Sequence, residues 1–526
     1  MHVTRALTIS TRAASRATVA VLLLGVAAAG AAQPQPAPRA DTSSPSGSAI
    51  ERGRYLARLG DCASCHTASG GKPFAGGMYL PTPFGQISVP NITPDLKTGI
   101  GAWSDEEFYR AMHEGIGRQG EYLYPVFPFP WYTKVTRSDV LAIKAYLFSL
   151  PAVAAPRAPL KLTWPASVRE SLGAWRAAFF TAREFQPLPG QTPEVNRGAY
   201  LVQGLGHCGE CHNQHNVAGV SRWSGTLEGG PIEGWYAPNL TDSKQEGLGV
   251  WSTAEVAQFL KTGSSPHGGT ALGPMQEVVQ RSLSHLSDPD LLAIGAYLKS
   301  VPGKDTYSDR AVPTARVAEG GTYLSYCASC HGVKGQGLAG EIPPLVNNGA
   351  VTAQGPQNVI RVVLGGLPAA RGMAPMPAVG ASMTDEEVTE AVNYVRNSFG
   401  NAAPANAAPG LVAQLRATTQ TTLTGDPSGG CGASDAAAQR LLSTDHLEQQ
   451  LAHMTEANML SVIDRELPRV RAAHAGGDSD GLVNGLTAAY CRVLNQANVP
   501  PAGRAARLGD FAVLVYGQLK HPDRGR

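Results

Sequence analysis

The pattern of apolar and polar residues predicts helices, and this pattern recurs three times along the chain. Each repeat ends in a segment with apolar residues at three-to-four spacing and one tyrosine. These segments are residues 139–151, 290–302 and 385–400. Each repeat begins with Gly-x-Tyr-Leu, at Gly53, Gly198 and Gly321. Packing of the first helix against the last would close a small helical domain, so the fold is predicted to be mainly α.

Six of the eight cysteines lie in Cys-x-x-Cys-His units, one in each repeat. The units are Cys62-Ala-Ser-Cys65-His66, Cys208-Gly-Glu-Cys211-His212 and Cys327-Ala-Ser-Cys330-His331. Two thiols one helical turn apart can each add to a haem vinyl group, and the next imidazole then faces the iron. A zinc site would need two such pairs for four ligands, and a thioredoxin-like pair would follow a strand in a βαβ unit. The spacing therefore predicts three covalently bound haem c groups.

The repeats and their flanks predict seven segments. They are a signal peptide at 1–32, a linker at 33–48, cytochrome c-like domains of class I at 49–155, 190–305 and 314–400, a linker at 401–430, and a small helical C-terminal domain at 431–526. The first two repeats also share Pro-Asn-x-Thr, at 90–93 and 238–241, and a Ser-x-x-Glu capping box. The third repeat is shorter and has Pro343-Pro344-Leu345, a rigid loop expected to lie against its haem.

The N-terminus has the pattern of a secretory signal. Three arginines precede an apolar run at 17–30, and small residues follow that run. The alternative is an uncleaved anchor, although the run is short for a membrane span of ~20 residues. Export predicts a periplasmic location, and Cys431 and Cys491 are expected to form a disulfide there.

Composition and charge narrow the function further. Of 526 residues, 43% are hydrophobic and 16% charged, and the net charge is only +2, so no basic tract indicates nucleic-acid binding. We find no Rossmann glycine signature, Walker loop or nucleophile–base pair. A substrate site of the chain's own is therefore not expected.

Two methionines are candidates for the second axial ligand, which saturates the iron so that the haem transfers electrons without binding substrate. Met275 follows Gly-Pro in repeat two, and Met376 lies between two prolines in repeat three, with Met373 as a rival. A loop fixed by proline can hold a thioether over a haem face. The alternative at each position is a buried packing methionine.

The first repeat departs from this pattern. Its position equivalent to Met275 is Phe127, which cannot ligate iron. We expect His113 to take that role, which would give a bis-imidazole haem of lower potential. Met112, the more distant Met78 or an empty position stay open, and an empty position would make haem one reactive.

The motifs resemble the three-haem cytochrome c subunits of bacterial membrane-associated dehydrogenases for alcohol, gluconate, sorbitol, fructose and aldehyde. The resemblance spans residues 49–400 and is carried by RGRYLARLGDCASCHTASGGKPFAGG, VPNITPD, GIGAWSDEEF, RGAYLVQGLGHCGECHN and GPMQEVV. It implies His66, His212 and His331 as proximal ligands, with Met275 and Met376 as distal ones. It also implies electron transfer from a quinoprotein, flavoprotein or molybdenum subunit to ubiquinone or a terminal oxidase, with peripheral attachment to the cytoplasmic membrane.

Other functions stay open at this point. Haem one could be five-coordinate and act on peroxide or a nitrogen oxide, or the chain could be a free-standing carrier without a dehydrogenase subunit. The C-terminal domain lies outside the resemblance. It is expected either to bind the partner or the membrane surface, or to be a structural appendix.

Overall fold

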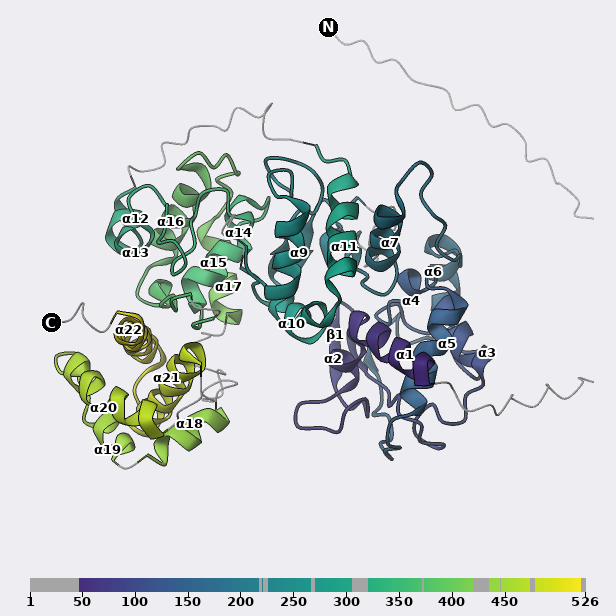
Figure 1. The fold of residues 1–526 in the computed structure, drawn as a ribbon, viewed down its shortest axis with the longest axis horizontal. Helices are drawn as coiled ribbons and strands as arrows, with labels where there is room; N and C mark the ends of the chain where they lie inside the picture. Colours follow the sequence, from purple (N-terminus) through teal and green to yellow (C-terminus); the bar gives the residue numbers. More distant parts are fainter. Residues whose placement is uncertain are drawn as a thin grey trace, which may run out of the picture. The chain divides into compact units, whose positions relative to one another are not determined.

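The chain forms helices joined by long loops, with two small antiparallel sheets (Figure 1). This computed structural model describes residues 47–216, 220, 226–265, 270–304, 320–370, 373–419, 435–444, 446–473 and 478–521. The predicted signal peptide and all but the end of the linker that follows it lie outside the described residues. The predicted mainly α fold is confirmed.

Repeat one packs its first helix against its last. Its elements are α1 (Gly47–Leu59), α2 (Cys62–His66), β1 (Tyr79–Thr82), β2 (Gly85–Ser88), α3 (Asp105–Glu114), α4 (Phe129–Tyr132), α5 (Arg137–Phe148), β3 (Lys161–Leu162) and α6 (Ser171–Phe179). Strand β2 pairs antiparallel with both β1 and β3. Strand β3 and helix α6 lie beyond residue 155, the predicted end of the first domain.

Repeat two has the same order of helices. Its elements are α7 (Pro193–Gln203), α8 (Gly209–His212), β4 (Gly230–Ile232), β5 (Trp235–Ala237), α9 (Thr253–Thr262), α10 (Pro274–Arg281), the 3-10 helix η1 (Leu283–His285) and α11 (Asp288–Ser300). Helices α3 and α9 each begin with the predicted capping box, in which the Ser hydroxyl accepts from the Glu backbone and the Glu carboxylate accepts from the Ser backbone.

Repeat three is shorter but gains a helix at its end. Its elements are α12 (Gly321–Tyr326), α13 (Ala328–His331), α14 (Gly349–Thr352), α15 (Gln357–Gly365), η2 (Val379–Ala381), α16 (Asp385–Asn397) and α17 (Pro409–Thr418). Helix α17 lies within the predicted linker 401–430. Its Val412 and Leu415 are buried against α15 and α16, so these apolar side chains make it part of the third domain. Residues 420–430 lie outside the described residues.

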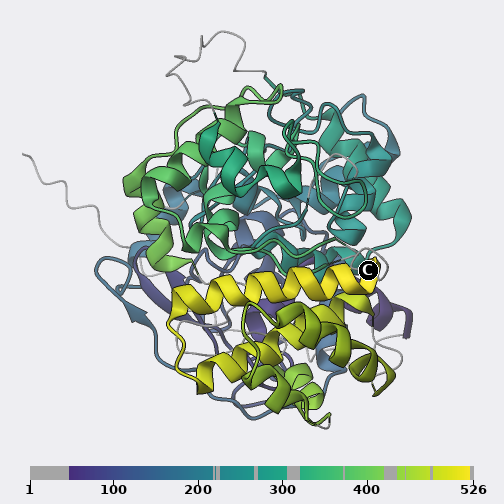
Figure 2. The same ribbon diagram turned by 90° about the vertical axis from the view of Figure 1, so that its left-hand side faces the viewer.

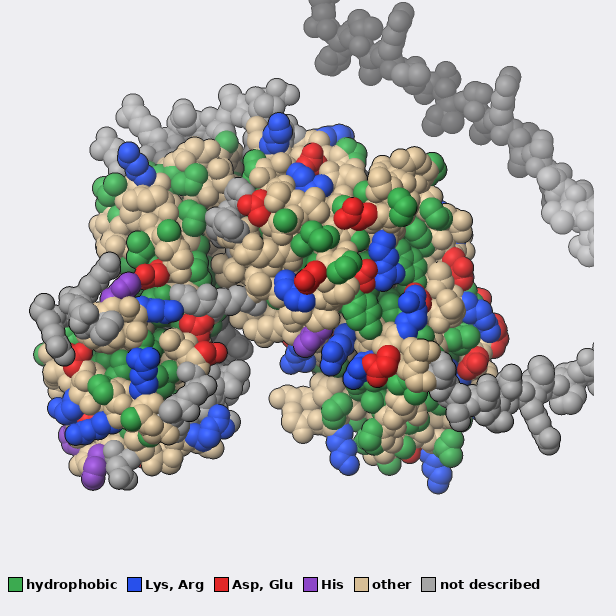
Figure 3. Space-filling view, in the orientation of Figure 1, with side chains coloured by type: hydrophobic (Ala, Val, Ile, Leu, Met, Phe, Trp, Pro, Cys, Tyr) green, Lys and Arg blue, Asp and Glu red, His purple; other side chains and the backbone are tan. Residues whose placement is uncertain are grey.

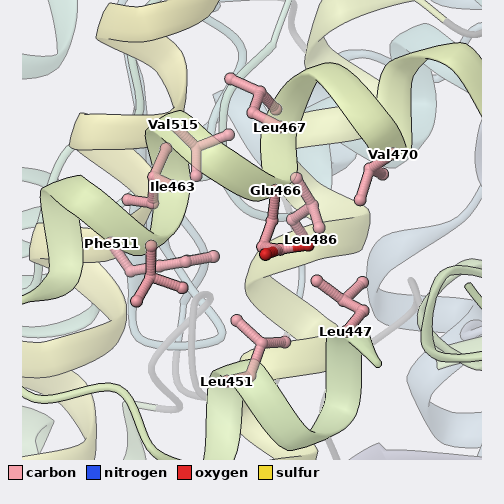
Figure 4. A pocket seen from close by; sticks show the side chains of 10 residues that line it. Leu447, Leu451, Ile463, Glu466, Leu467, Val470, Leu486, Phe511 and Val515 are labelled. Carbon is pink, nitrogen blue, oxygen red and sulfur yellow. The ribbon is translucent and has the colours of Figure 1, made fainter. Parts of the chain in front are cut away.

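The described part of the C-terminal domain consists of helices that pack around an apolar core, to which Ala369 of repeat three also belongs. They are α18 (Asp435–Leu442), α19 (Leu447–Ala452), α20 (Met459–Ala473), α21 (Ser479–Gln496) and α22 (Pro501–Lys520), the last being the 20-residue helix drawn in yellow in Figure 2. A small space in this core is lined by apolar side chains and by Glu466, which pairs with Arg465 (Figure 4). Cys491 is disulfide-bonded, and Cys431 lies outside the described residues.

Glycine permits the close crossing of the first and last helices in repeats one and two. A Cβ at Gly53 would lie 1.8 Å from the Ala142 carbonyl oxygen, and one at Gly198 would lie 1.9 Å from that of Ala293. No side chain fits at such distances. At Gly321 of repeat three, by contrast, a Cβ would meet no atom within 4 Å. The shared Gly-x-Tyr-Leu sequence therefore serves this crossing in only two of the three repeats.

Repeats one and two share one apolar core and exchange equivalent contacts. The Tyr55 hydroxyl donates to Asp290 of repeat two at 2.6 Å, and the Tyr200 hydroxyl donates to Asp139 of repeat one at 2.7 Å. Arg52 and Arg197 pair with these same carboxylates, each from the first helix of the carboxylate's own repeat. Each carboxylate thus joins an arginine of its own repeat to a tyrosine of the other.

Charges of both signs are interspersed on the face drawn in Figure 3. This agrees with a net charge of +2 and shows no single-sign field on that face. In the part of the chain that the structure describes, no helix has the length and apolar character needed to cross a membrane.

The helix crossing makes a direct prediction for stability. Gly198→Ala should lower the free energy of unfolding by about 1–3 kcal/mol or more, because the methyl group overlaps the Ala293 carbonyl and the helices must separate. Calorimetric unfolding of the full chain measures this. Gly321→Ala is the matched control at the equivalent motif position, and we expect a near-neutral change. Equal losses in the two variants would contradict the role given to the crossing.

Candidate haem-binding sites

Each Cys-x-x-Cys-His unit lies at or beside a short helix that directly follows the first helix of its repeat. Burial raises the pKa of the Cys62 and Cys208 thiols to about 12 and that of Cys327 to about 11. A reactive redox dithiol has a lowered pKa instead. The six motif cysteines are free thiols, and the described residues contain no cluster of His, Cys, Asp and Glu suited to a metal ion. The raised thiol pKa values disfavour redox dithiols.

The motif histidines of repeats one and two are held in one tautomer. The Nδ1 atom of His66 lies 2.8 Å from the Pro90 carbonyl oxygen, and that of His212 lies 2.7 Å from the Pro238 carbonyl oxygen. Because a carbonyl only accepts, each Nδ1 carries the proton, and each Nε2 keeps its lone pair. Burial also lowers the pKa of His66, to about 4, so its imidazole is neutral. A neutral imidazole with a free Nε2 is the form that binds iron.

The Nδ1 atom of His331 in repeat three is held less firmly than those of His66 and His212. The carbonyl of Pro343 raises the pKa of His331 against the larger, lowering effect of burial. However, His331 Nδ1 makes no hydrogen bond of normal geometry among the described residues. The rigid Pro343-Pro344-Leu345 loop expected from the sequence is thus the counterpart of the Pro90 and Pro238 loops.

The shared Pro-Asn-x-Thr motif fixes the two acceptor carbonyls. Asn91 Oδ1 accepts from the backbone N–H and the hydroxyl of Thr93, at 2.9 and 2.8 Å. Asn239 and Thr241 make the same pair, at 2.8 and 2.6 Å. Each such turn orients the preceding proline carbonyl toward the imidazole. The sequence comparison of the repeats found this motif but gave it no role.

These residues fit a c-type haem. In each repeat two thiols stand one helical turn apart, and in repeats one and two a hydrogen bond leaves the adjacent imidazole ready to ligate. Cys62 with Cys65, Cys208 with Cys211, and Cys327 with Cys330 would form the thioether bonds. When bound, the haem supplies one-electron redox chemistry, while the protein supplies ligands, orientation and dielectric.

The candidate distal residues of repeats two and three lie at the edges of apolar cores. Met275 is the second residue of α10 and is partly buried against the core of repeats one and two. Met376 is partly buried against the core of repeat three, and its backbone pairs with Leu367. Met373 belongs to the same hairpin. Their roles as ligands stay predictions.

In repeat one, Phe127 lies in the loop between α3 and α4. Its ring packs edge-on against Tyr132 with centroids 5.5 Å apart. His113 stacks on Tyr109, and its Nδ1 lies 3.5 Å from the Thr133 hydroxyl. Met112 is buried in the apolar core. Among the described residues, no contact joins His113 to His66. Ligation of the iron by His113 stays a prediction.

Aromatic side chains connect the motifs of repeats one and two, which the sequence did not reveal. Trp131 Nε1 donates to Glu210 of the second motif at 2.5 Å, and its ring covers Gly209. The neighbouring Tyr132 ring lies 5.8 Å from that of His207. Burial raises the pKa of Tyr132 well above its ordinary value. Helix α4 therefore lies between the two candidate haem sites.

The family comparisons agree with these sites. The cytochrome c family matches residues 50–151, and the family described as cytochrome c oxidase, cbb3-type, subunit III matches residues 317–395. The chain is 38% identical to the gluconate 2-dehydrogenase cytochrome c subunit of Pantoea cypripedii, over 70% of this chain and 89% of that protein. It is 37% identical to the cytochrome c subunit of the quinone-dependent alcohol dehydrogenase of Komagataeibacter europaeus, over 72% and 86%. The cytochrome subunit of fructose dehydrogenase of Gluconobacter japonicus is 36% identical, over 70% and 82%.

These likenesses span most of both chains in each pair, and the matched families are those of c-type cytochromes. The residues that would bind haem stand in equivalent places in successive repeats. The chain therefore belongs to the family of cytochrome c subunits of bacterial dehydrogenases.

Proposed function

We propose that this protein carries three haem c groups and relays electrons from the catalytic subunit of a periplasmic dehydrogenase to ubiquinone or a terminal oxidase. The observation that carries the proposal is the recurrence of one arrangement: a Cys-x-x-Cys pair beside a buried or half-buried histidine that faces a proline carbonyl. It occurs in full in repeats one and two and in looser form in repeat three. His66, His212 and His331 are the proximal ligands.

A separate catalytic subunit follows from the names of the relatives, which are cytochrome subunits of gluconate, alcohol and fructose dehydrogenases. That partner is of the quinoprotein, flavoprotein or molybdenum class. The predicted signal places the protein in the periplasm, at the outer face of the cytoplasmic membrane. Attachment there is peripheral, through the partner or an amphipathic surface.

The contacts between repeats support a relay along the chain. Trp131 and Tyr132 lie between the motifs of repeats one and two. Repeats two and three are joined by Asn358, whose amide exchanges two hydrogen bonds with the Tyr236 backbone at 2.9 and 2.8 Å. Arg361 stacks on Trp235 at 5.3 Å from the ring centroid. Such contacts keep neighbouring haem domains together, so that electrons pass within one chain.

The haem count is open to a direct test. Intact-mass measurement of the exported protein should show three covalent haems, and cleavage of the signal peptide will be read from the same mass. A double variant, Cys327→Ser with Cys330→Ser, should lose one haem of the three. The matched variant at Cys208 and Cys211 should also lose one. A wild-type mass with two haems would contradict the proposal.

Repeat one has Phe127 where repeat two has the candidate distal ligand Met275, and this difference generates a second prediction. Phe127→Met should offer haem one a thioether ligand in place of the expected His113 and raise its midpoint potential by roughly 100 mV, a fraction of the ~0.8 V range that axial ligands span. Met275→Phe should lower the potential of haem two and let cyanide bind it. Redox titration and the long-wavelength band of Met-ligated ferric haem measure both changes. The prediction fails if Phe127→Met leaves both readouts unchanged.

A further inference from the structure

The segment of repeat three that carries both candidate methionines is a short hairpin. Leu367 and Met376 exchange two backbone hydrogen bonds, at 2.8 and 2.9 Å, and the Met373 N–H donates to the Ala370 carbonyl at 2.9 Å. The hairpin begins at Gly366, whose φ is 68° and where a Cβ would lie 2.5 Å from the Met376 carbonyl oxygen. We call residues 366–370 and 373–378 the methionine hairpin.

The first arm of this hairpin is bound by α21 of the C-terminal domain. Asn484 Oδ1 accepts from the Ala369 N–H at 3.1 Å, and Asn484 Nδ2 donates to the Ala369 carbonyl at 2.8 Å. One side-chain amide thus satisfies both backbone groups of one residue, as a neighbouring strand would. Ala369 is 2% exposed and belongs to the apolar core of the C-terminal domain. Polar and apolar contacts with the C-terminal domain therefore both hold Ala369 in place.

The second arm meets α22. A Cβ at Gly509 would lie 2.8 Å from the Cβ of Pro377, the residue directly after Met376. Only glycine lets the helix come so near to this proline. At the end of α22, His521 Nε2 lies 2.8 Å from a carboxylate oxygen of Glu341, whose own carbonyl accepts from the Ala374 N–H at 2.8 Å. The C-terminal domain therefore contacts both arms of the hairpin and the loop beside it.

The hairpin needs such support because a ladder of this size is marginal by itself. In repeat one the equivalent loop is held by the region of α6, where Arg169 and Arg176 donate to the carbonyls of Tyr122 and Glu114. In the described part of repeat three, helices α21 and α22 take this place. The C-terminal domain thus supports the methionine hairpin of repeat three as the α6 region supports the equivalent loop of repeat one.

We propose that the C-terminal domain is a positioning element that holds Met376 on the iron of haem three. The inference rests on the proposed function, in which Met376 is the distal ligand. Asn484 is the central positioning residue, because its amide binds both backbone groups of Ala369 in the hairpin. By keeping the hairpin closed, it maintains Met ligation and excludes external ligands from the iron.

The test uses the full chain with its haems bound. Asn484→Ala should raise the rate of cyanide binding to ferric haem three by roughly tenfold, since two hydrogen bonds that oppose opening are lost. It should also weaken the long-wavelength band of Met-ligated ferric haem and lower the potential of haem three. Gln496→Ala is the matched control: Gln496 lies on the same helix, is exposed and donates to Glu448 of its own domain, so we expect wild-type values.

The variant Met376→Ala distinguishes the assignment of Met376 as the ligand from the positioning role of the C-terminal domain. If it leaves the band and the cyanide rate unchanged, Met376 is not the ligand and the assignment in the proposed function is wrong. If it alters both while Asn484→Ala behaves as wild type, the positioning role is wrong. Should Asn484→Ala fail to fold by circular dichroism, the surface variant His521→Ala decides, with a smaller rise in cyanide rate expected and an unchanged rate overturning the inference.

Discussion

The close crossing of the first and last helices is the constraint on which repeats one and two depend. The two backbones approach so closely at Gly53 and Gly198 that neither position has room for a methyl group. The Cys-x-x-Cys-His units follow directly after these first helices, so the crossing fixes where the thiols and imidazoles stand. The carbonyls of Pro90 and Pro238 come from loops later in each repeat and complete the sites. The backbone crossing therefore determines the positions of the side chains that would bind haem.

The three repeats are built alike but supported differently. Repeats one and two merge their apolar cores, and each lends an aspartate to a tyrosine of the other. Repeat three has a smaller core, a looser contact to its motif histidine and a buried Arg396, which donates to the carbonyls of Val351 and Pro404. It depends on added elements, α17 and the C-terminal domain. This difference in supporting contacts is a physical reason for the haem of repeat three to differ in its properties from those of repeats one and two.

Much of this could be predicted from the sequence because the signals are local and repeated. The haem motifs, the capping boxes and the terminal helices each involve residues within a few positions of one another, and repetition separates them from chance. Strand β3 and helix α17 were not predicted from the sequence, since each is defined by partners elsewhere in the chain. The contacts of Trp131 with Gly209 and of Asn484 with Ala369 left no sequence signal, because each occurs once and joins distant segments.

The exchanged tyrosine–aspartate contacts have a consequence for how the chain can change over time. Repeats one and two are related to each other as two subunits of a symmetric dimer are, with the same surface used twice. A substitution on one first helix therefore alters a contact in the other repeat, and drift in either half is constrained by its counterpart. The duplicated halves are expected to vary as a pair, whereas repeat three is freer to acquire a different ligand loop and a new domain to hold it.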